Sequence, residues 1–173
     1  VGVIVSGEIG VGKSRLLEEF QHYLRLNDTQ LYAGNCYEGT SNAYQPFIES
    51  LRQLVYGLGL DSELCQRFRP ALARLLPEVD MRGEENGRPD VTFGPDKEKI
   101  YFIDRISHFL LEAAEQRPYV LFLNNLHWAD EASLELLGAL RRRDQRLLGL
   151  LPLARDAQQR LAVRLLLLQQ RLR

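Results

Sequence analysis

Eight residues near the start of the chain have the types and spacing of a phosphate-binding loop. The pattern G-x-x-x-x-G-K-[ST] is matched at every fixed position by Gly7, Glu8, Ile9, Gly10, Val11, Gly12, Lys13 and Ser14. Glycines let such a loop turn its backbone N–H groups inward, where they join the N-terminus of the following helix as an anion cradle. We expect Lys13 to reach the β- and γ-phosphates and the Ser14 hydroxyl to ligate Mg²⁺. Arg15 follows directly and is included in the predicted site.

A second stretch, LFLNNLHWAD at 121–130, departs from the chemistry that this loop normally serves. A strand downstream of a phosphate loop usually ends in carboxylates that hold Mg²⁺ and orient the attacking water. Here it ends in Asn124 and Asn125. An amide oxygen can accept a hydrogen bond from a Mg²⁺-bound water, but it brings no charge and is no general base. Loss of such a base typically costs on the order of 10²–10⁴ in rate, so we expect nucleotide binding with slow hydrolysis.

Other polar residues near this stretch leave alternatives open. Asp130 or Glu131 could replace the missing acid, although Asp130 is better used as a helix cap. The His127 side chain could simply have its hydrogen bonds satisfied at the end of the strand. Alternatively, it could lie near a γ-phosphate or a neighbouring subunit. Trp128 is better explained by packing. Tyr44, with Pro46 and Phe47, could line a nucleotide base, but sealing the core is the preferred interpretation. The histidines and the two cysteines show no metal-site spacing.

The elements that must position these residues alternate along the chain. Short apolar runs predict strands over 1–5, 30–37, 119–123 and 147–151. Amphipathic patterns and caps predict helices over 13–26, 46–56, 61–77, 96–116 and 130–143, and a helical tail from Asp156. Leu16, Leu17, Phe20 and Leu24 of the first helix, and Ile100, Ile103, Ile106, Phe109 and Leu110 of the fourth, are expected to face the core. The stretch 81–94 reads as an exposed loop. This alternation predicts an α/β fold with a parallel sheet covered on both faces.

Composition excludes several classes of protein. The chain has 173 residues, 45% of them apolar and 26% charged, as in a globular domain with a substantial core. A net charge of −1 gives no global field to recruit nucleic acid, and two cysteines make no disulfide framework. No apolar run approaches the roughly 20 residues of a membrane span. Because the chain begins inside an apolar run without Met, we interpret it as a segment of a longer protein.

The end of the chain is basic. Between 141 and 173, nine arginines face two aspartates. This could be a nucleic-acid patch, but no aromatic residues interleave with the arginines, and a solvated helix face that packs on other parts of the protein is preferred. The cluster Arg141, Arg142 and Arg143 could alternatively supply an arginine finger to a neighbouring subunit.

Four segments in order resemble a known family: GEIGVGKSRLLEEF, NCYEGTSNAYQPFIESLRQL, LARLLPEV and RPYVLFLNNLHWADEASLELL. They look like the AAA-like ATPase module of the signal-transduction ATPases with numerous domains, over roughly 1–155. The resemblance implies a three-layer P-loop domain of the additional-strand type, with the fourth strand between the first and third. A fifth strand and a helical lid would then lie beyond residue 173. It also places Asn124 where the family has its Mg²⁺-directing acid and Asn125 where the family has its water-activating acid.

The resemblance implies a function as well. The chain is expected to be a single partial domain over 1–173, with a basic helical tail at 156–173, that binds ATP with Mg²⁺ in the cytoplasm. Its ATP or ADP state would switch other domains of the same polypeptide, in signal transduction or transcription regulation, or switch homo-oligomer assembly. Nucleic acid would be contacted only through an output domain outside the chain. Arg155 could sense the γ-phosphate, although a surface arginine is preferred. The alternatives are an active ATPase that uses another acid, and a vestigial structural or interaction domain.

Overall fold

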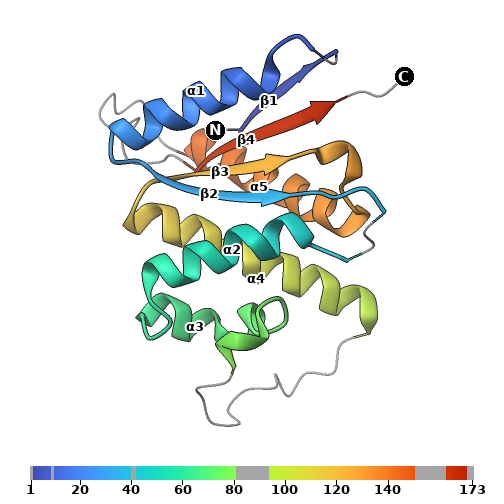
Figure 1. The fold of residues 1–173 in the computed structure, drawn as a ribbon. Coiled ribbons are helices and arrows are strands. Elements are labelled where there is room, and N and C mark those ends of the chain that lie inside the picture. The colour runs from blue at the N-terminus through green and yellow to red at the C-terminus, as the bar shows by residue number, and fades with distance from the viewer. Residues whose placement is uncertain (1, 9, 40–41, 81–93, 151–162, 171–173) are drawn as a thin grey trace.

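A computed structural model of the chain describes residues 2–8, 10–39, 42–80, 94–150 and 163–170. Within them, four parallel strands form one sheet (Figure 1). The strands are β1 (Gly2–Gly7), β2 (Gln30–Asn35), β3 (Tyr119–Asn124) and β4 (Val163–Gln170). The helices are α1 (Lys13–Leu26), α2 (Gln45–Leu58), α3 (Glu63–Leu72), α4 (Pro95–Gln116) and α5 (Glu131–Leu150), with short 3₁₀ helices η1 (Pro77–Val79) and η2 (Leu126–Trp128). The α/β class and the parallel sheet agree with the prediction.

The strand order is β1-β4-β3-β2, so the last strand lies between the first and third. This order is the one that the resemblance predicts, but the residues that form the inserted strand are different. The strand predicted over 147–151 is wrong, because α5 continues through Leu150. The helix predicted from Asp156 is wrong over 163–170, where β4 pairs with both β1 and β3. Residues 151–162, which include Arg155, and residues 171–173 lie outside the described residues.

The misassigned strand has a physical explanation. A central strand of a parallel sheet has neighbours on both edges and helices on both faces, so it reads as a continuous apolar run instead of an alternation. The run Leu165–Leu168 fits that description, but its leucines also fit a helical stripe. Periodicity alone does not separate the two, and the pairing with β1 and β3 decides for the strand.

The two faces of the sheet carry separate cores. Tyr119, Leu121 and Leu123 of β3 pack into the larger core, with α2, α3, α4 and α5. Val120 and Phe122, which alternate with them, pack against Leu17 and Leu24 of α1. Figure 1 shows α1 on one side of the sheet and α2 and α4 on the other. Alternate residues of a strand therefore face α1 on one side of the sheet and the layer of α2 and α4 on the other.

Some expected core positions and boundaries differ from the structure. Ile100 and Leu16 are 68% and 60% exposed. The buried stripe of α4 runs through Phe102, Ile106 and Phe109, and this spacing turns Ile100 to the opposite side of the helix. The third helix begins after Ser62, which caps it in place of Asp61, and ends at Leu72, before Pro77. The predicted loop 81–94 lies outside the described residues except for Gly94.

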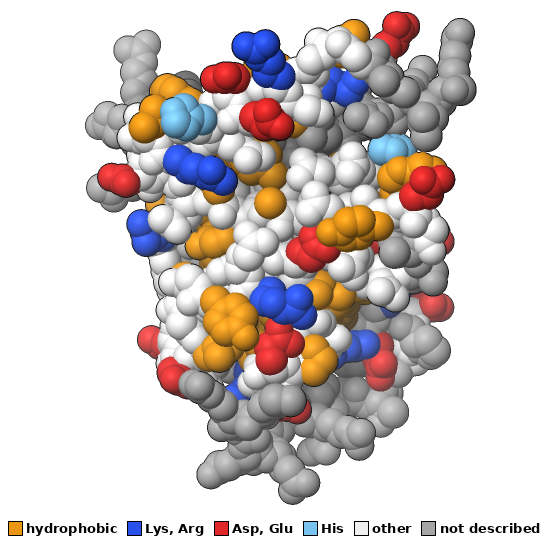
Figure 2. Space-filling view, viewed as in Figure 1, with side chains coloured by type: hydrophobic (Ala, Val, Ile, Leu, Met, Phe, Trp, Pro, Cys, Tyr) orange, Lys and Arg blue, Asp and Glu red, His pale blue; other side chains and the backbone are white. Residues whose placement is uncertain are grey.

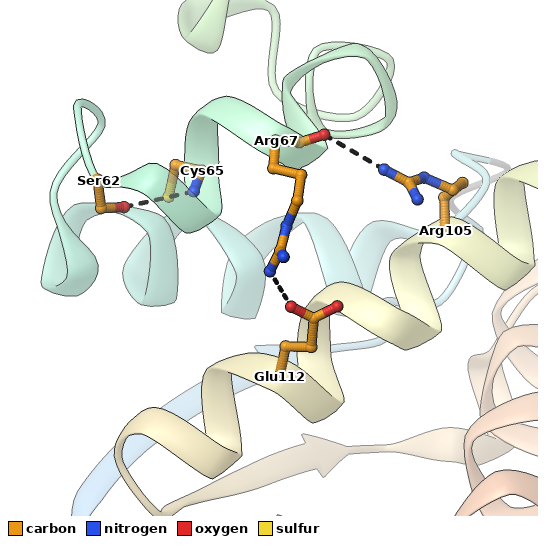
Figure 3. A network of polar contacts seen from close by, with 5 residues as sticks. All are labelled: Ser62, Cys65, Arg67, Arg105 and Glu112. Atoms are coloured by element: carbon orange, nitrogen blue, oxygen red, sulfur yellow. Dashed lines mark hydrogen bonds and ion pairs between the residues drawn. The ribbon is translucent and has the colours of Figure 1, made fainter.

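Helices α3 and α4 are joined by a network of polar contacts far along the chain from the phosphate loop (Figure 3). Arg67 pairs with Glu112, and the Arg105 guanidinium donates to the Arg67 carbonyl oxygen at 3.2 Å. Arg105 also lies 4.3 Å from the centre of the Phe68 ring, which meets Phe109 edge-on. Half-exposed ion pairs contribute only about 0–1 kcal/mol, so the buried rings contribute most to this contact.

Candidate functional site

The phosphate loop connects the carboxyl end of β1 to the first turn of α1. Gly10 and Gly12 have φ values of 89° and 87°, in the left-handed region that glycine adopts without penalty. Gly12 is the N-cap of α1, and no side chain caps the helix. The first N–H groups of α1 are therefore left for another acceptor, as in anion sites at helix N-termini. Ile9 lies outside the described residues.

Lys13 carries the only side chain of the described loop that is buried, with 7% exposure. Its Nζ donates to the carbonyl oxygens of Gly7 at 2.7 Å and Glu8 at 2.5 Å. An ammonium group has three donors, so one remains for a phosphate oxygen. A Cβ on Gly7 would come within 3.2 Å of the Val11 side chain, which shows that the turn closes tightly. The loop thus fits the phosphates that the motif predicts.

Ser14 and Arg15 follow Lys13 in the first turn of α1, and both are exposed. The Ser14 hydroxyl is the one predicted metal ligand that the loop offers. Among the described residues, no group of three or more His, Cys, Asp or Glu side chains could hold a metal ion. A Mg²⁺ ion at this edge would therefore depend on Ser14, phosphate oxygens and water.

Asn124 lies at the carboxyl end of β3 and faces the α1 side of the sheet. It alternates with Val120 and Phe122, the residues of β3 that pack on α1. In the sheet register it is the direct partner of Asn35 at the end of β2, and its Nδ2 donates to Asn35 Oδ1 at 3.0 Å. The structure therefore brings Asn124 to the face from which the phosphate loop enters α1.

Asn125 leaves the strand with φ 56°, in the left-handed region. Its carbonyl oxygen accepts from the Trp128 N–H at 2.9 Å and closes the short helix η2. Asn and Asp visit this conformation more readily than other non-glycine residues. Asn125 is thus compatible with the local backbone, and an Asp would be as well.

Asp130, the acid considered as a substitute, caps α5. Its Oδ1 accepts from the Ser133 N–H at 2.9 Å and from the Tyr44 N–H at 3.3 Å, and its Oδ2 accepts from the Ser133 hydroxyl at 2.5 Å. The predicted cap is confirmed. Glu131 is exposed in the first turn of α5. Three of the roughly four acceptor sites of the Asp130 carboxylate are thus occupied, and taking up a proton there would weaken the helix cap.

Two residues that the sequence analysis missed complete this edge. Glu49 of α2 accepts, through Oε2, from the Asn35 backbone N–H at 2.9 Å and from Asn35 Nδ2 at 3.2 Å. A polar residue at the carboxyl end of a parallel strand is a general sign of a site, and this rule could have found Asn35. Glu49 gives no such signal, because it lies 14 residues away on a helix.

The buried Cys36 thiol reports the electrostatic character of this edge. Its backbone N–H donates to the Asn124 carbonyl oxygen at 3.1 Å. Burial, and then the negative charges of Asp130 and Glu49, raise the pKa of Cys36 to about 11. Asp130 and Glu49 thus place negative charge near the end of β2 and β3, although the two facing side chains there are neutral amides.

Of the remaining predicted residues, Tyr44 packs against the core, whereas the role of His127 is not assigned by its contacts. The Tyr44 ring meets Phe102 edge-on at 5.3 Å, which supports a core role for Tyr44. Beside it, a surface cavity of about 450 Å³ opens between α2 and α4, on the side of the sheet opposite α1. The His127 and Trp128 rings lie 4.9 Å apart, centre to centre, with their planes tilted by 48°. The buried Nδ1 of His127 finds no hydrogen-bond partner among the described residues.

A glycine-rich loop between the first strand and first helix of a parallel sheet, with a buried lysine inside it, defines a P-loop nucleotide-binding domain. Comparison with protein families agrees, since residues 1–154 match the AAA ATPase domain. The chain belongs to this family, as the resemblance of its motifs predicts. Curated proteins and solved structures gave no match. Within the described residues, no helix has the length and apolar character needed to cross a membrane.

Proposed function

We propose that the chain is an ATP-binding regulatory module that holds Mg-ATP on residues 7–14 and hydrolyses it slowly. The observation that carries this proposal is the contrast within one site. The phosphate loop is complete, with Lys13 buried inside it, whereas Asn124 and Asn125 stand at the end of the strand where acids would work.

The binding half of the proposal rests on the loop. The backbone N–H groups at the start of α1 and the third donor of Lys13 Nζ would receive the β- and γ-phosphate oxygens. Lys13 already lies inside the loop, between the carbonyl oxygens of Gly7 and Glu8. A preorganised cation loses less conformational entropy on binding than one recruited from solvent.

The slow-hydrolysis half rests on the amides. Mg²⁺ would neutralise charge on the phosphates, held by Ser14 and the nucleotide itself. Asn124 Oδ1 would accept from a metal-bound water without adding charge, and Asn125 would not take a proton from an attacking water. Asp130 is engaged as the cap of α5, which argues against a fully active ATPase that uses this acid.

The regulatory role rests on the family resemblance. The ATP or ADP state would be passed to other domains of the same cytoplasmic polypeptide, in signal transduction or transcription regulation, or to a homo-oligomer. His127, with its unpartnered Nδ1 among the described residues, and Arg155 are the candidate sensors of the γ-phosphate. Direct nucleic-acid binding is not part of the proposal, because charges of both signs intermingle over the face in Figure 2 and the net charge is −1.

Calorimetry with ATP and ADP, in the presence and absence of Mg²⁺, tests the proposal. The parent chain should bind both nucleotides, and Lys13→Ala should bind them much more weakly. The exposed Lys97 offers a matched control, since Lys97→Ala removes a lysine outside the loop. Equal nucleotide binding by the parent and Lys13→Ala, or no binding by the parent, would refute it.

A further inference from the structure

The side-chain contacts at the ends of β2 and β3 form a relay that starts at a charged group. Glu49 accepts from Asn35 Nδ2, and Asn35 Oδ1 in turn accepts from Asn124 Nδ2. The three residues come from α2, β2 and β3, so the sheet and its covering helix bring them together. Oδ1 of Asn124 accepts no hydrogen bond from the described residues.

The direction of this relay follows from donor and acceptor chemistry. An ionised carboxylate only accepts hydrogen bonds, so Glu49 requires the NH₂ end of the Asn35 amide. Asn35 must then present its oxygen to Asn124, and the NH₂ group of Asn124 must donate to that oxygen. The oxygen of Asn124 is the end that remains. A carboxylate on α2 thereby fixes which end of the second amide is offered to the α1 side of the sheet.

We infer that Glu49 is the positioning residue that makes Asn124 present its Oδ1 as a hydrogen-bond acceptor to the water shell of Mg²⁺. The inference rests on the proposed nucleotide site and adds a residue to it. Without the carboxylate, the Asn124 amide could reverse and present an NH₂ group, which a metal-bound water does not accept as a partner.

Glu49 also has a structural role from which the inference must be separated. Asn35 lies on an edge strand, and Glu49 satisfies its outward backbone N–H. One turn later on α2, Gln53 does the same for Ala33, donating to its carbonyl oxygen at 2.8 Å and accepting from its N–H at 3.2 Å. Within the described residues, Gln53 makes no side-chain hydrogen bond to either asparagine, so Gln53→Ala is the matched control for loss of an edge contact.

The test is ADP binding by calorimetry, with Mg²⁺ and with a chelator, because ADP avoids the complication of turnover. In Glu49→Gln, the new amide can donate to Asn35 Oδ1 and so permit the relay to reverse. The affinity gained from Mg²⁺ should fall about fivefold, the value of one ordinary hydrogen bond, while Mg²⁺-free affinity stays at the parent value. Gln53→Ala should keep the full Mg²⁺ gain.

A double variant restores the direction and provides the sharpest outcome. With Glu49→Gln and Asn35→Asp together, position 35 only accepts, so Asn124 must again donate its NH₂ group and offer its oxygen. The Mg²⁺ gain should return to the parent value. If Glu49→Gln keeps the full gain, or if Gln53→Ala loses as much, the inference is overturned and the nucleotide site stands. If Glu49→Gln does not fold, Asn35→Ala replaces it, and an unchanged Mg²⁺ gain there overturns the inference equally. A parent chain that binds no ADP overturns both the inference and the proposed function.

Discussion

The carboxyl ends of β1 and β3 differ in the charge of their side chains. At the end of β1, the buried Lys13 ammonium and the first N–H groups of α1 are left to meet an anion, and within the described residues the lysine donates to loop carbonyls alone. At the end of β3 stand two neutral amides, Asn124 and Asn125, and the nearby acids have other tasks. Asp130 caps α5, and Glu49 holds the edge of β2.

This difference teaches that holding phosphates and activating water are physically separable. Phosphate binding needs backbone geometry and positive charge, which Gly10, Gly12 and Lys13 supply locally. Activation of water needs a base with a free lone pair at the correct place. A chain can lose the activation of water while it keeps phosphate binding. Such a protein would bind a nucleotide and hydrolyse it slowly.

Replacing the amides by acids should remove the contrast and have the largest effect. In Asn124→Asp/Asn125→Asp, Mg²⁺-dependent phosphate release from ATP should rise on the order of 10²–10⁴-fold, because a general base and a charged metal partner are restored. Aspartate also suits the left-handed backbone at position 125. The same pair in a Lys13→Ala background is the control and should stay inactive. A parent chain that already turns over as fast as the restored variant would contradict the comparison.

Removing the charge at the other end should weaken binding instead of turnover. Lys13→Ala deletes the buried ammonium, and a hydrogen bond to a charged group is worth about 1.5–3 kcal/mol, so ATP affinity should fall roughly 10- to 150-fold. Fluorescence titration with a labelled ATP measures this loss, with Lys97→Ala as the matched lysine variant. The comparison fails if the affinity lost in Lys13→Ala matches that of the control.

Asp130 allows the role of a cap to be separated from that of a catalytic acid. Asn caps helices about as well as Asp, whereas Ala does not, so Asp130→Ala should lose about 0.5–2 kcal/mol of unfolding free energy and Asp130→Asn only a small part of that. Chemical denaturation measures both. Any slow turnover of the parent should survive in Asp130→Asn. Loss of turnover in this variant at unchanged stability would assign the base to Asp130.

The phosphate loop could be predicted from the sequence, whereas the residues at the carboxyl ends of β2 and β3 could be predicted only in part. Local rules decide the loop, because glycine spacing, a preceding strand and a following helix all lie within one stretch. The amides at 124–125 and the Asp130 cap were also local. The relay was not, because Asn35 and Asn124 lie 89 residues apart and meet only through the pairing of β2 with β3.

The prediction of the residues that form the inserted strand was wrong for a related reason. Its leucine run is compatible with two periods, and only its place between β1 and β3 distinguishes them. The order of the strands could be anticipated from the family resemblance, but not the residues that form β4. Tertiary pairing overrides local pattern most readily in central strands, where no polar alternation marks the faces.

The smallest effect tests whether the amide end is shielded from water and lies near negative charge. The pKa of the Cys36 thiol is raised to about 11, above its ordinary value, by burial first and then by Asp130 and Glu49. Since the folded chain favours the protonated thiol, this contribution to stability is complete below the ordinary thiol pKa and is lost as pH rises through about 11. Between these values, unfolding free energy should fall more steeply with pH in the parent than in Cys36→Ala, a difference that cancels the tyrosines common to both. Denaturation curves across this range give the two slopes. Equal slopes would mean that the thiol ionises freely, and that the edge beside Asn124 is neither dry nor negative.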